Sequence, residues 1–299
     1  MAWGYQIAIY LFMAGTGAGA FLTARITELY SRENFRPLVR AGAVLSGLVV
    51  ALGMPFLILD LGIGKFEPWR LIFLYRNLGS PMTWGVYILT AFVPVALLYG
   101  LIELIEIENL KGPLEKLKKF KGWIVNIGSV LAVATAIYTG LLIGIVKGVP
   151  LWNTTILPVL FVVSALSTGL AAAVVLATAW PMGTRKLVSE HFFYLNQVHA
   201  AMILAELILI FSWLFISWHG STASAESVRI LISGRLSLFF WIGIVVFGIV
   251  DPLIIFVYEV VQGKPLVGAA MFVSDGSVLV GGLVLRYLVI SAAVPIAIS

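Results

Sequence analysis

Long apolar runs alternate with short polar segments along the whole chain. A helix needs roughly 20 apolar residues to cross a bilayer, and each run reaches about that length. The pattern therefore predicts an all-α, polytopic membrane protein. Its eight expected transmembrane helices lie at about residues 5–27, 38–60, 84–106, 122–146, 155–180, 194–218, 236–259 and 276–297.

The segments between the runs are short, which predicts a single integral membrane domain, 1–299, without a soluble module. A weak similarity links YLFMAGTGAGAFL in the first span to PVLFVVSALSTGLAAA in the fifth. It predicts two four-helix halves, 1–150 and 151–299, arranged as a parallel repeat. Gly15 and Gly19 in the first span favour close helix packing, or a flat face for a ligand.

Composition agrees with a membrane protein and limits its cofactors. The chain is 61% apolar and 11% charged, with a mean hydropathy of +1.06. It has no cysteine, so iron–sulfur clusters, cysteine zinc sites and covalent haem have no thiolate ligands here. His199 and His219 stand about 30 Å apart along one helix, and His191 lies in a connector. No histidine pair can bracket a haem, so we expect neither haem nor another metal in this chain.

The basic residues are distributed unequally between the two sides. Six Lys and Arg lie in connectors on the side of the termini, twelve lie on the other side, and Arg286 falls inside a span. The positive-inside rule predicts a cell (cytoplasmic) membrane protein with both termini on the outer face. The net charge of +5 reflects this topology and predicts no nucleic-acid partner. The run ELIEIENLKGPLEKLKKFKG is expected to be a solvated cytoplasmic anchor.

Four ionisable residues deep within spans stand out, because such side chains are costly there and mark functional sites. They are His199 and Glu206 in the sixth span, Asp251 in the seventh and Arg286 in the eighth. His199 and Glu206 are seven residues apart, on one helix face. The four residues predict a proton path. The alternative is structural: Glu206 and Arg286 form an ion pair, and His199 is a hydrogen-bonded interior residue.

A second polar group is expected at the outer ends of the first four spans. It consists of Asp60, Trp84, Tyr138 and Thr139. A quinone head group needs hydrogen-bond partners, an apolar slot and a titratable group for proton exchange. Asp60 and Tyr138 are the candidate catalytic residues, and all four are candidate quinone ligands. The alternative is an ordinary interfacial belt of Trp and Tyr.

The chain resembles the NrfD/PsrC-type membrane subunits of nitrite and polysulfide reductases. The resemblance runs nearly end to end and is carried by AIYLFMAGTGAGAFL, LDLG…WR…SPMTWG, YTGLLIG…PLWNTTILPVLFVVSALSTG, WIGIVVFGIVDPLII and VGGLVLRYLVI. Asp60, Arg70 and Tyr138 fall on positions similar to the family's quinone pocket and docking region. The chain departs from the family where LGIGKFEPWR replaces LGRPxR, and it has no histidine in the first span.

The resemblance implies a haem-free subunit that reacts with quinol or quinone, of menaquinone type. It implies an extrinsic ferredoxin-like partner with four iron–sulfur clusters, docked near Arg70 and Arg76, and a molybdopterin catalytic subunit. Two other classes stay open. A secondary transporter would use the midplane charges, and a structural anchor would leave quinone chemistry to other subunits.

Overall fold

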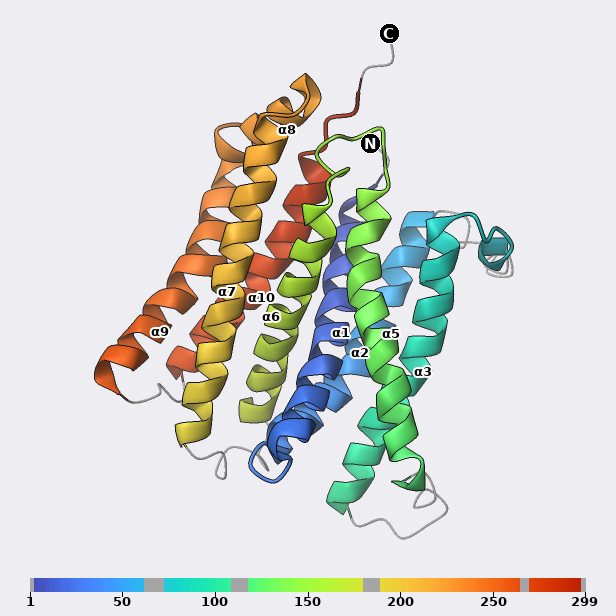
Figure 1. Ribbon diagram of the computed structural model, residues 1–299, viewed down its shortest axis with the longest axis vertical. Helices are drawn as coiled ribbons and strands as arrows, with labels where there is room; N and C mark the ends of the chain where they lie inside the picture. The colour runs from blue at the N-terminus through green and yellow to red at the C-terminus, as the bar shows by residue number, and fades with distance from the viewer. Residues whose placement is uncertain (1–2, 62–72, 109–117, 180–188, 264–268, 297–299) are drawn as a thin grey trace.

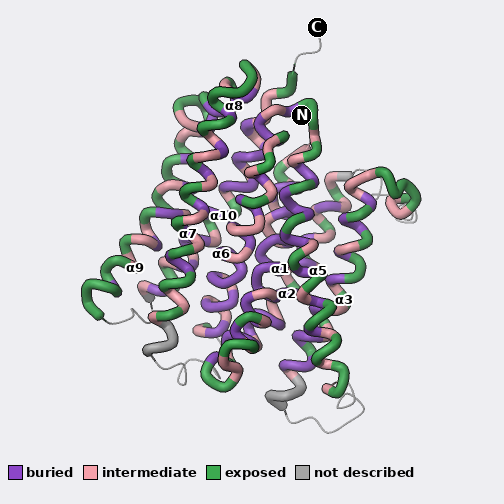
Figure 2. The backbone as a smooth tube through the Cα atoms, viewed as in Figure 1, coloured by how far each residue is buried: buried purple, intermediate pink, exposed green. Residues whose placement is uncertain are grey.

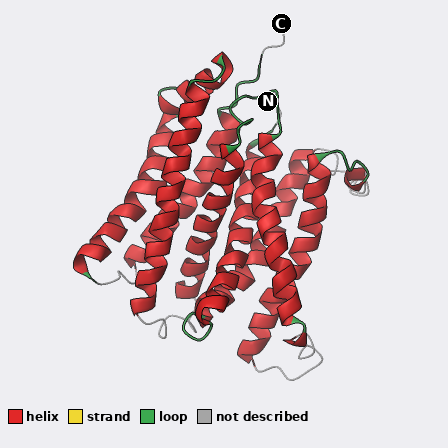
Figure 3. Ribbon diagram, viewed as in Figure 1, coloured by secondary structure: helices red, strands yellow, loops and turns green. Residues whose placement is uncertain are grey.

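The described parts of the chain are helical. The computed structural model describes residues 3–61, 73–108, 118–179, 189–263 and 269–296, and in these ranges helices are joined by short loops without a strand (Figure 3). Within them, eight helices are long and apolar enough to cross a membrane. The predicted all-α class and the eight spans are confirmed.

The spans follow the predicted order with small shifts at their ends. They are α1 (Tyr5–Ser31), α2 (Arg36–Leu61), α3 (Pro81–Glu108), α5 (Lys121–Gly144), α6 (Ile156–Ala179), α7 (Ser189–Trp218), η3 (Phe239–Val250) continuing into α9 (Asp251–Gln262), and α10 (Ala269–Ser291). A short helix, α8 (Thr222–Ile232), follows α7. It was not predicted, and Ser221 caps it by accepting a hydrogen bond from the Ser224 backbone N–H at 3.2 Å.

The last span differs most from its prediction, because it begins at Ala269 and ends at Ser291. The predicted span begins directly after Asp275. In the structure Asp275 is buried, with 4% of its surface exposed. The far end stops early because Pro295 disfavours helix in the residue before it. The Ile296 N–H donates to the Gly148 carbonyl instead, at 3.0 Å.

The seventh span is not a uniform α-helix. Residues Phe239–Val250 form a π-helix, and the α-helix resumes at Asp251 with Pro252 in its first turn. A π-helical stretch is rare and frequently occurs at functional sites. The change from π-helix to α-helix occurs at Asp251, one of the predicted intramembrane charged residues.

The spans stand side by side, and both termini lie at one end of the bundle (Figure 1). We call this the terminal end, and the other the opposite end. Helix α1 packs against α2, α5, α6 and α10, and the buried residues gather along α1, α6 and α10 (Figure 2). The division into halves 1–150 and 151–299 stays a prediction.

Glycine allows α1 and α6 to touch through their backbones. A Cβ added to Gly19 would lie 1.8 Å from the carbonyl oxygen of Ala165, and one on Gly169 would overlap Gly19. A Cβ on Gly15 would make only ordinary contact, 3.4 Å from the Ala165 Cβ. Close packing is therefore required at Gly19, whereas Gly15 has room for a methyl group.

Candidate functional site

The tyrosine predicted as a catalytic residue lies at the terminal end, against helix α3. Tyr138 of α5 is 5% exposed. Its ring covers Gly85 so closely that a Cβ there would lie 1.7 Å from Cζ and 2.0 Å from the hydroxyl oxygen. Gly85, in the first turns of α3, thus provides the space that the phenol occupies.

The predicted carboxylate lies across α1 from this tyrosine. Asp60 is half-buried near the end of α2, and its Oδ1 accepts a hydrogen bond from the Gly4 backbone N–H at 3.2 Å. The residue before Gly4, Trp3, stacks on Trp152 with ring centroids 5.3 Å apart. The Trp152 indole donates to the Val289 carbonyl at 2.6 Å. The segment before α1 is therefore held at both α2 and α10.

A third group, which the sequence did not identify, lies between them. Tyr10 of α1 is fully buried, its hydroxyl has no hydrogen-bond partner among the described residues, and it lies near Tyr138 of α5. Since α1 packs against both α2 and α5, Tyr10 connects the surroundings of Asp60 and Tyr138. No hydrogen bond joins these two described residues directly. A tyrosine in an apolar run gives no sequence signal of a polar role.

The other residues predicted for the terminal end, where the structure describes them, make contacts with groups other than Tyr138. Trp84 is 56% exposed, and its indole donates to the Leu78 carbonyl at 2.9 Å, which fixes the connector before α3. The Thr139 hydroxyl is buried and donates to the Ala136 carbonyl of its own helix at 2.7 Å. Arg76 is exposed and lies 5.5 Å from the Phe73 ring. Arg70 lies outside the described residues.

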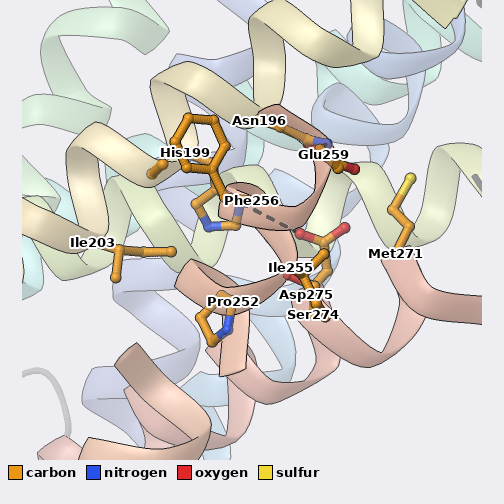
Figure 4. Close-up of a pocket in the computed structure, with 11 residues that line it drawn as sticks. Asn196, His199, Ile203, Pro252, Ile255, Phe256, Glu259, Met271, Ser274 and Asp275 are labelled. Atoms are coloured by element: carbon orange, nitrogen blue, oxygen red, sulfur yellow. Dashed lines mark hydrogen bonds and ion pairs between the residues drawn. The ribbon is translucent and has the colours of Figure 1, made fainter. Parts of the chain in front are cut away.

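The predicted proton path begins, toward the opposite end, with a histidine held on both ring nitrogens. His199 Nδ1 lies 3.4 Å from Asp275 Oδ1, and Nε2 lies 3.3 Å from the Ser167 hydroxyl. Figure 4 shows the His199–Asp275 contact beside Asn196 and Glu259, where the Asn196 amide donates to Glu259 at 2.7 Å. These residues line a pocket with room for about one water molecule.

The two charges nearest the middle of the membrane meet at a serine. Arg286 is fully buried, and its Nη1 donates to the Ser164 hydroxyl at 2.5 Å and to the Gly282 carbonyl at 2.9 Å. The carboxyl group of Glu206 interacts with the same hydroxyl and electrostatically with Arg286 and His199. No salt bridge within 4.0 Å joins Glu206 and Arg286, both of which the structure describes, so the two residues do not form the direct ion pair of the structural alternative.

Several polar atoms of this group are unsatisfied. Arg286 Nε and Nη2, Asp275 Oδ2 and Asp251 Oδ2 are buried without a hydrogen-bond partner in the described structure. Buried polar atoms are nearly always paired with protein or water. No contact joins Asp251 of α9 to the described His199, Glu206, Asp275 or Arg286, so the structure brings the other predicted residues together but not this one. Asp275 and Ser164 were missed, because one resembles a helix boundary and the other a small packing residue.

A separate set of charges ties the first half together at the opposite end. We call Glu28, Arg32, Glu103 and Lys121 the ionic cluster. Lys121 pairs with Glu103 and, at 3.0 Å, with Glu28, and Arg32 lies 3.2 Å from Glu103. Glu103 is fully buried. The prediction of a solvated anchor is wrong for the two ends of that run, because Glu103 and Lys121 pair inside the bundle.

The described residues contain no group of three or more His, Asp or Glu arranged to hold a metal ion. What the site offers is hydroxyl, carboxyl, imidazole and guanidinium groups in an apolar bundle. Such groups can bind a polar head group and pass protons.

Comparison with known proteins agrees with the motifs. The family model described as "Polysulphide reductase, NrfD" matches residues 1–297. A polysulfide reductase chain of Wolinella succinogenes is 31% identical over 269 residues, which cover 85% of this chain and 83% of that protein. The NrfD homolog of Haemophilus influenzae is 28% identical with the same coverage. A selenate reductase subunit of Mesobacillus selenatarsenatis is 22% identical, over 98% of this chain and 74% of its own length. The chain is thus a multi-pass membrane protein and belongs to the NrfD/polysulphide reductase family.

Proposed function

We propose that this protein is the membrane anchor and quinone-binding subunit of a respiratory oxidoreductase. It passes electrons between membrane quinone and an extrinsic iron–sulfur subunit, beside a molybdopterin catalytic subunit. Its relatives are named as parts of polysulfide and selenate reductases, which supports a role within a reductase complex. The observation that carries the quinone assignment is the Tyr10 hydroxyl, which is buried without a partner among the described residues near Tyr138.

The residues at the terminal end fit a quinone head group. Quinone oxygens accept hydrogen bonds, and quinol hydroxyls donate them. Tyr138 binds one oxygen, and Tyr10 binds the same ligand from α1. Asp60 is the titratable group that takes up or returns protons, and the Gly4 N–H orients its carboxylate. The apolar walls of the bundle surround the ring. Quinol oxidation releases two electrons and two protons, so the electrons leave for the partner and the protons leave through Asp60.

Substitution of the hydroxyl and carboxyl groups tests this assignment. Quinol oxidation is measured in the intact membrane complex, with a menaquinol analogue as donor. Tyr138→Phe should lower the rate about tenfold, the value of one hydrogen bond to the ligand, and Asp60→Asn about a hundredfold, as for loss of general base catalysis. The matched control is Tyr87→Phe, which removes an exposed hydroxyl bonded to the Tyr75 carbonyl. A purely structural anchor predicts full activity in all three variants.

The partner surface lies on the terminal end in this proposal. The excess of basic residues on the other side supports an orientation with both termini outside the cytoplasm. The exposed Arg76 then contributes to docking of the iron–sulfur subunit, together with Arg70. Docking there brings a cluster close to the quinone. Loss of the copurifying iron–sulfur subunit from an Arg76→Glu variant is the expected result, and full retention contradicts it.

Proton movement through the second half is the less direct part of the proposal. His199, Glu206, Asp251 and Arg286 carry it, and Asp275 and Ser164 complete the route. Glu206→Gln should abolish proton uptake linked to quinone turnover while the complex still assembles. Glu226→Gln is the control, because that carboxylate pairs with Arg229 at the surface. Unchanged coupling in Glu206→Gln removes Glu206 from the path. Substrate flux without a redox partner would instead indicate a secondary transporter.

A further inference from the structure

An apolar groove opens on the membrane-facing surface at the opposite end, away from the residues proposed to bind quinone. Its walls are α1, with Ile26 and Tyr30, and α7, with Tyr194 and Val198, while Leu170 of α6 lies at its base. It has a volume of about 350 Å³. Helix α6 packs against both α1 and α7. The groove therefore runs between α1 and α7, with α6 at its base.

The groove is open to the bilayer. Ile26, Tyr30, Tyr194 and Val198 are between 51% and 75% exposed. Its inner surface belongs to a second hydrophobic core cluster, in which Phe35 and Leu170 are almost fully buried. The Thr27 hydroxyl in the wall donates to the Thr23 carbonyl at 2.5 Å, so it already has a partner. These features favour a hydrocarbon chain over a polar head group inside the groove.

The charges beside the groove indicate which lipid supplies that chain. Residues 25–40 contain four arginines and two glutamates. Arg25 and Arg32 pair with Glu28, and the other three charged residues are Glu33, Arg36 and Arg40, with one positive charge in excess. Arg36 is exposed and directly follows Phe35, which lines the groove. Tyr30 and Tyr194 place hydroxyl-bearing rings at the same end, as is common where a membrane protein meets the head groups. A basic pocket beside apolar helices suits an anionic lipid head group.

We propose that this groove is a binding site for an anionic phospholipid, whose acyl chain lies between α1 and α7 and whose phosphate is held by Arg36. The site is distinct from the quinone site at the terminal end. It would join the first and second halves of the bundle between α1 and α7.

Native mass spectrometry of the full-length protein, reconstituted with phosphatidylglycerol or phosphatidylcholine and released from detergent, tests the site. The wild type should retain at least one phosphatidylglycerol under conditions that remove phosphatidylcholine. Val198→Trp fills the groove and should lose the retained lipid. Val257→Trp makes the same change at an exposed position of α9 and should keep it. Arg36→Gln, at the surface, should retain both lipids equally.

Other results overturn the proposal. Equal retention of both lipids by the wild type indicates ordinary boundary lipid, and retention by Val198→Trp places the lipid elsewhere. A bound quinone that is lost in Val198→Trp identifies the groove as a quinone site. A dimer that is lost in the same variant identifies it as a contact between copies. Quinol oxidation measured in parallel keeps these outcomes separate from the quinone assignment, because groove variants should retain it.

Discussion

Gly85→Ala is a sharp test of the quinone site, because the change adds one methyl group and removes no polar atom. Gly85 lies in α3, and the Tyr138 ring occupies the place where its Cβ would be. The substitution therefore acts on the phenol without altering its chemistry. A role for Tyr138 in positioning quinol predicts a large functional effect from this small change.

The size of the displacement follows from the structure. The added Cβ would lie 1.7 Å from Tyr138 Cζ, whereas ordinary contacts begin at 3.4 Å. The two atoms must therefore separate by about 1.7 Å, through movement of the ring or of α3. Overpacking of this kind costs about 1–3 kcal/mol of stability. A misplacement of about 1 Å can cost about a hundredfold in rate, so the loss should exceed that of Tyr138→Phe.

The assay is quinol oxidation by the intact complex, reported as kcat/KM beside the thermal unfolding temperature. Gly122→Ala is the matched control, since nothing lies within 4 Å of its added Cβ and alanine favours a helix. In the double variant Gly85→Ala/Tyr138→Ala the space is restored, so its activity should equal that of Tyr138→Ala alone. Wild-type activity in a folded Gly85→Ala protein refutes the role of Tyr138, and additive losses in the double variant show that Gly85 acts by another route.

Three further changes probe the bundle. Gly19→Ala should lower stability by at least about 3 kcal/mol, because its Cβ would meet the Ala165 carbonyl, while Gly15→Ala should be tolerated; thermal unfolding in detergent distinguishes them, and equal effects contradict the α1–α6 contact. Glu103→Gln removes a fully buried carboxylate that pairs with Arg32 and Lys121 and should cost about 3 kcal/mol, whereas Glu226→Gln at the surface should cost less than about 1 kcal/mol. Ser164→Ala removes the hydroxyl between Glu206 and Arg286 and should reduce quinone-linked proton uptake; undiminished uptake excludes it from the path.

The sequence was sufficient for the spans because a bilayer demands long apolar segments, and these can be recognised without any knowledge of packing. It was less informative at their ends. The apolar pattern marks Asp275 as a boundary residue, yet it lies inside the bundle against His199. The π-helix before Asp251 has no signature in the apolar pattern, because it depends on how the backbone hydrogen bonds shift rather than on which side chains are present.

The candidate site was partly predictable for a similar reason. Charged residues within spans attract attention because of their cost, so His199, Glu206, Asp251 and Arg286 were found. Ser164 and Tyr10 were not, since serine and tyrosine are common in membrane helices and acquire meaning only from their neighbours. The pairing of Glu103 with Arg32 is equally hidden, because Arg32 lies more than seventy residues earlier in the chain.

The ionic cluster has a mechanical consequence for access to the proposed quinone site. It joins α1, α3 and α5 to one another at the opposite end. These helices can therefore tilt relative to one another about that end. A small change of tilt then produces little motion beside Glu103 and the greatest motion at the terminal end, where Tyr10, Gly85 and Tyr138 lie. The bundle can widen for a ligand there without breaking its strongest polar contacts.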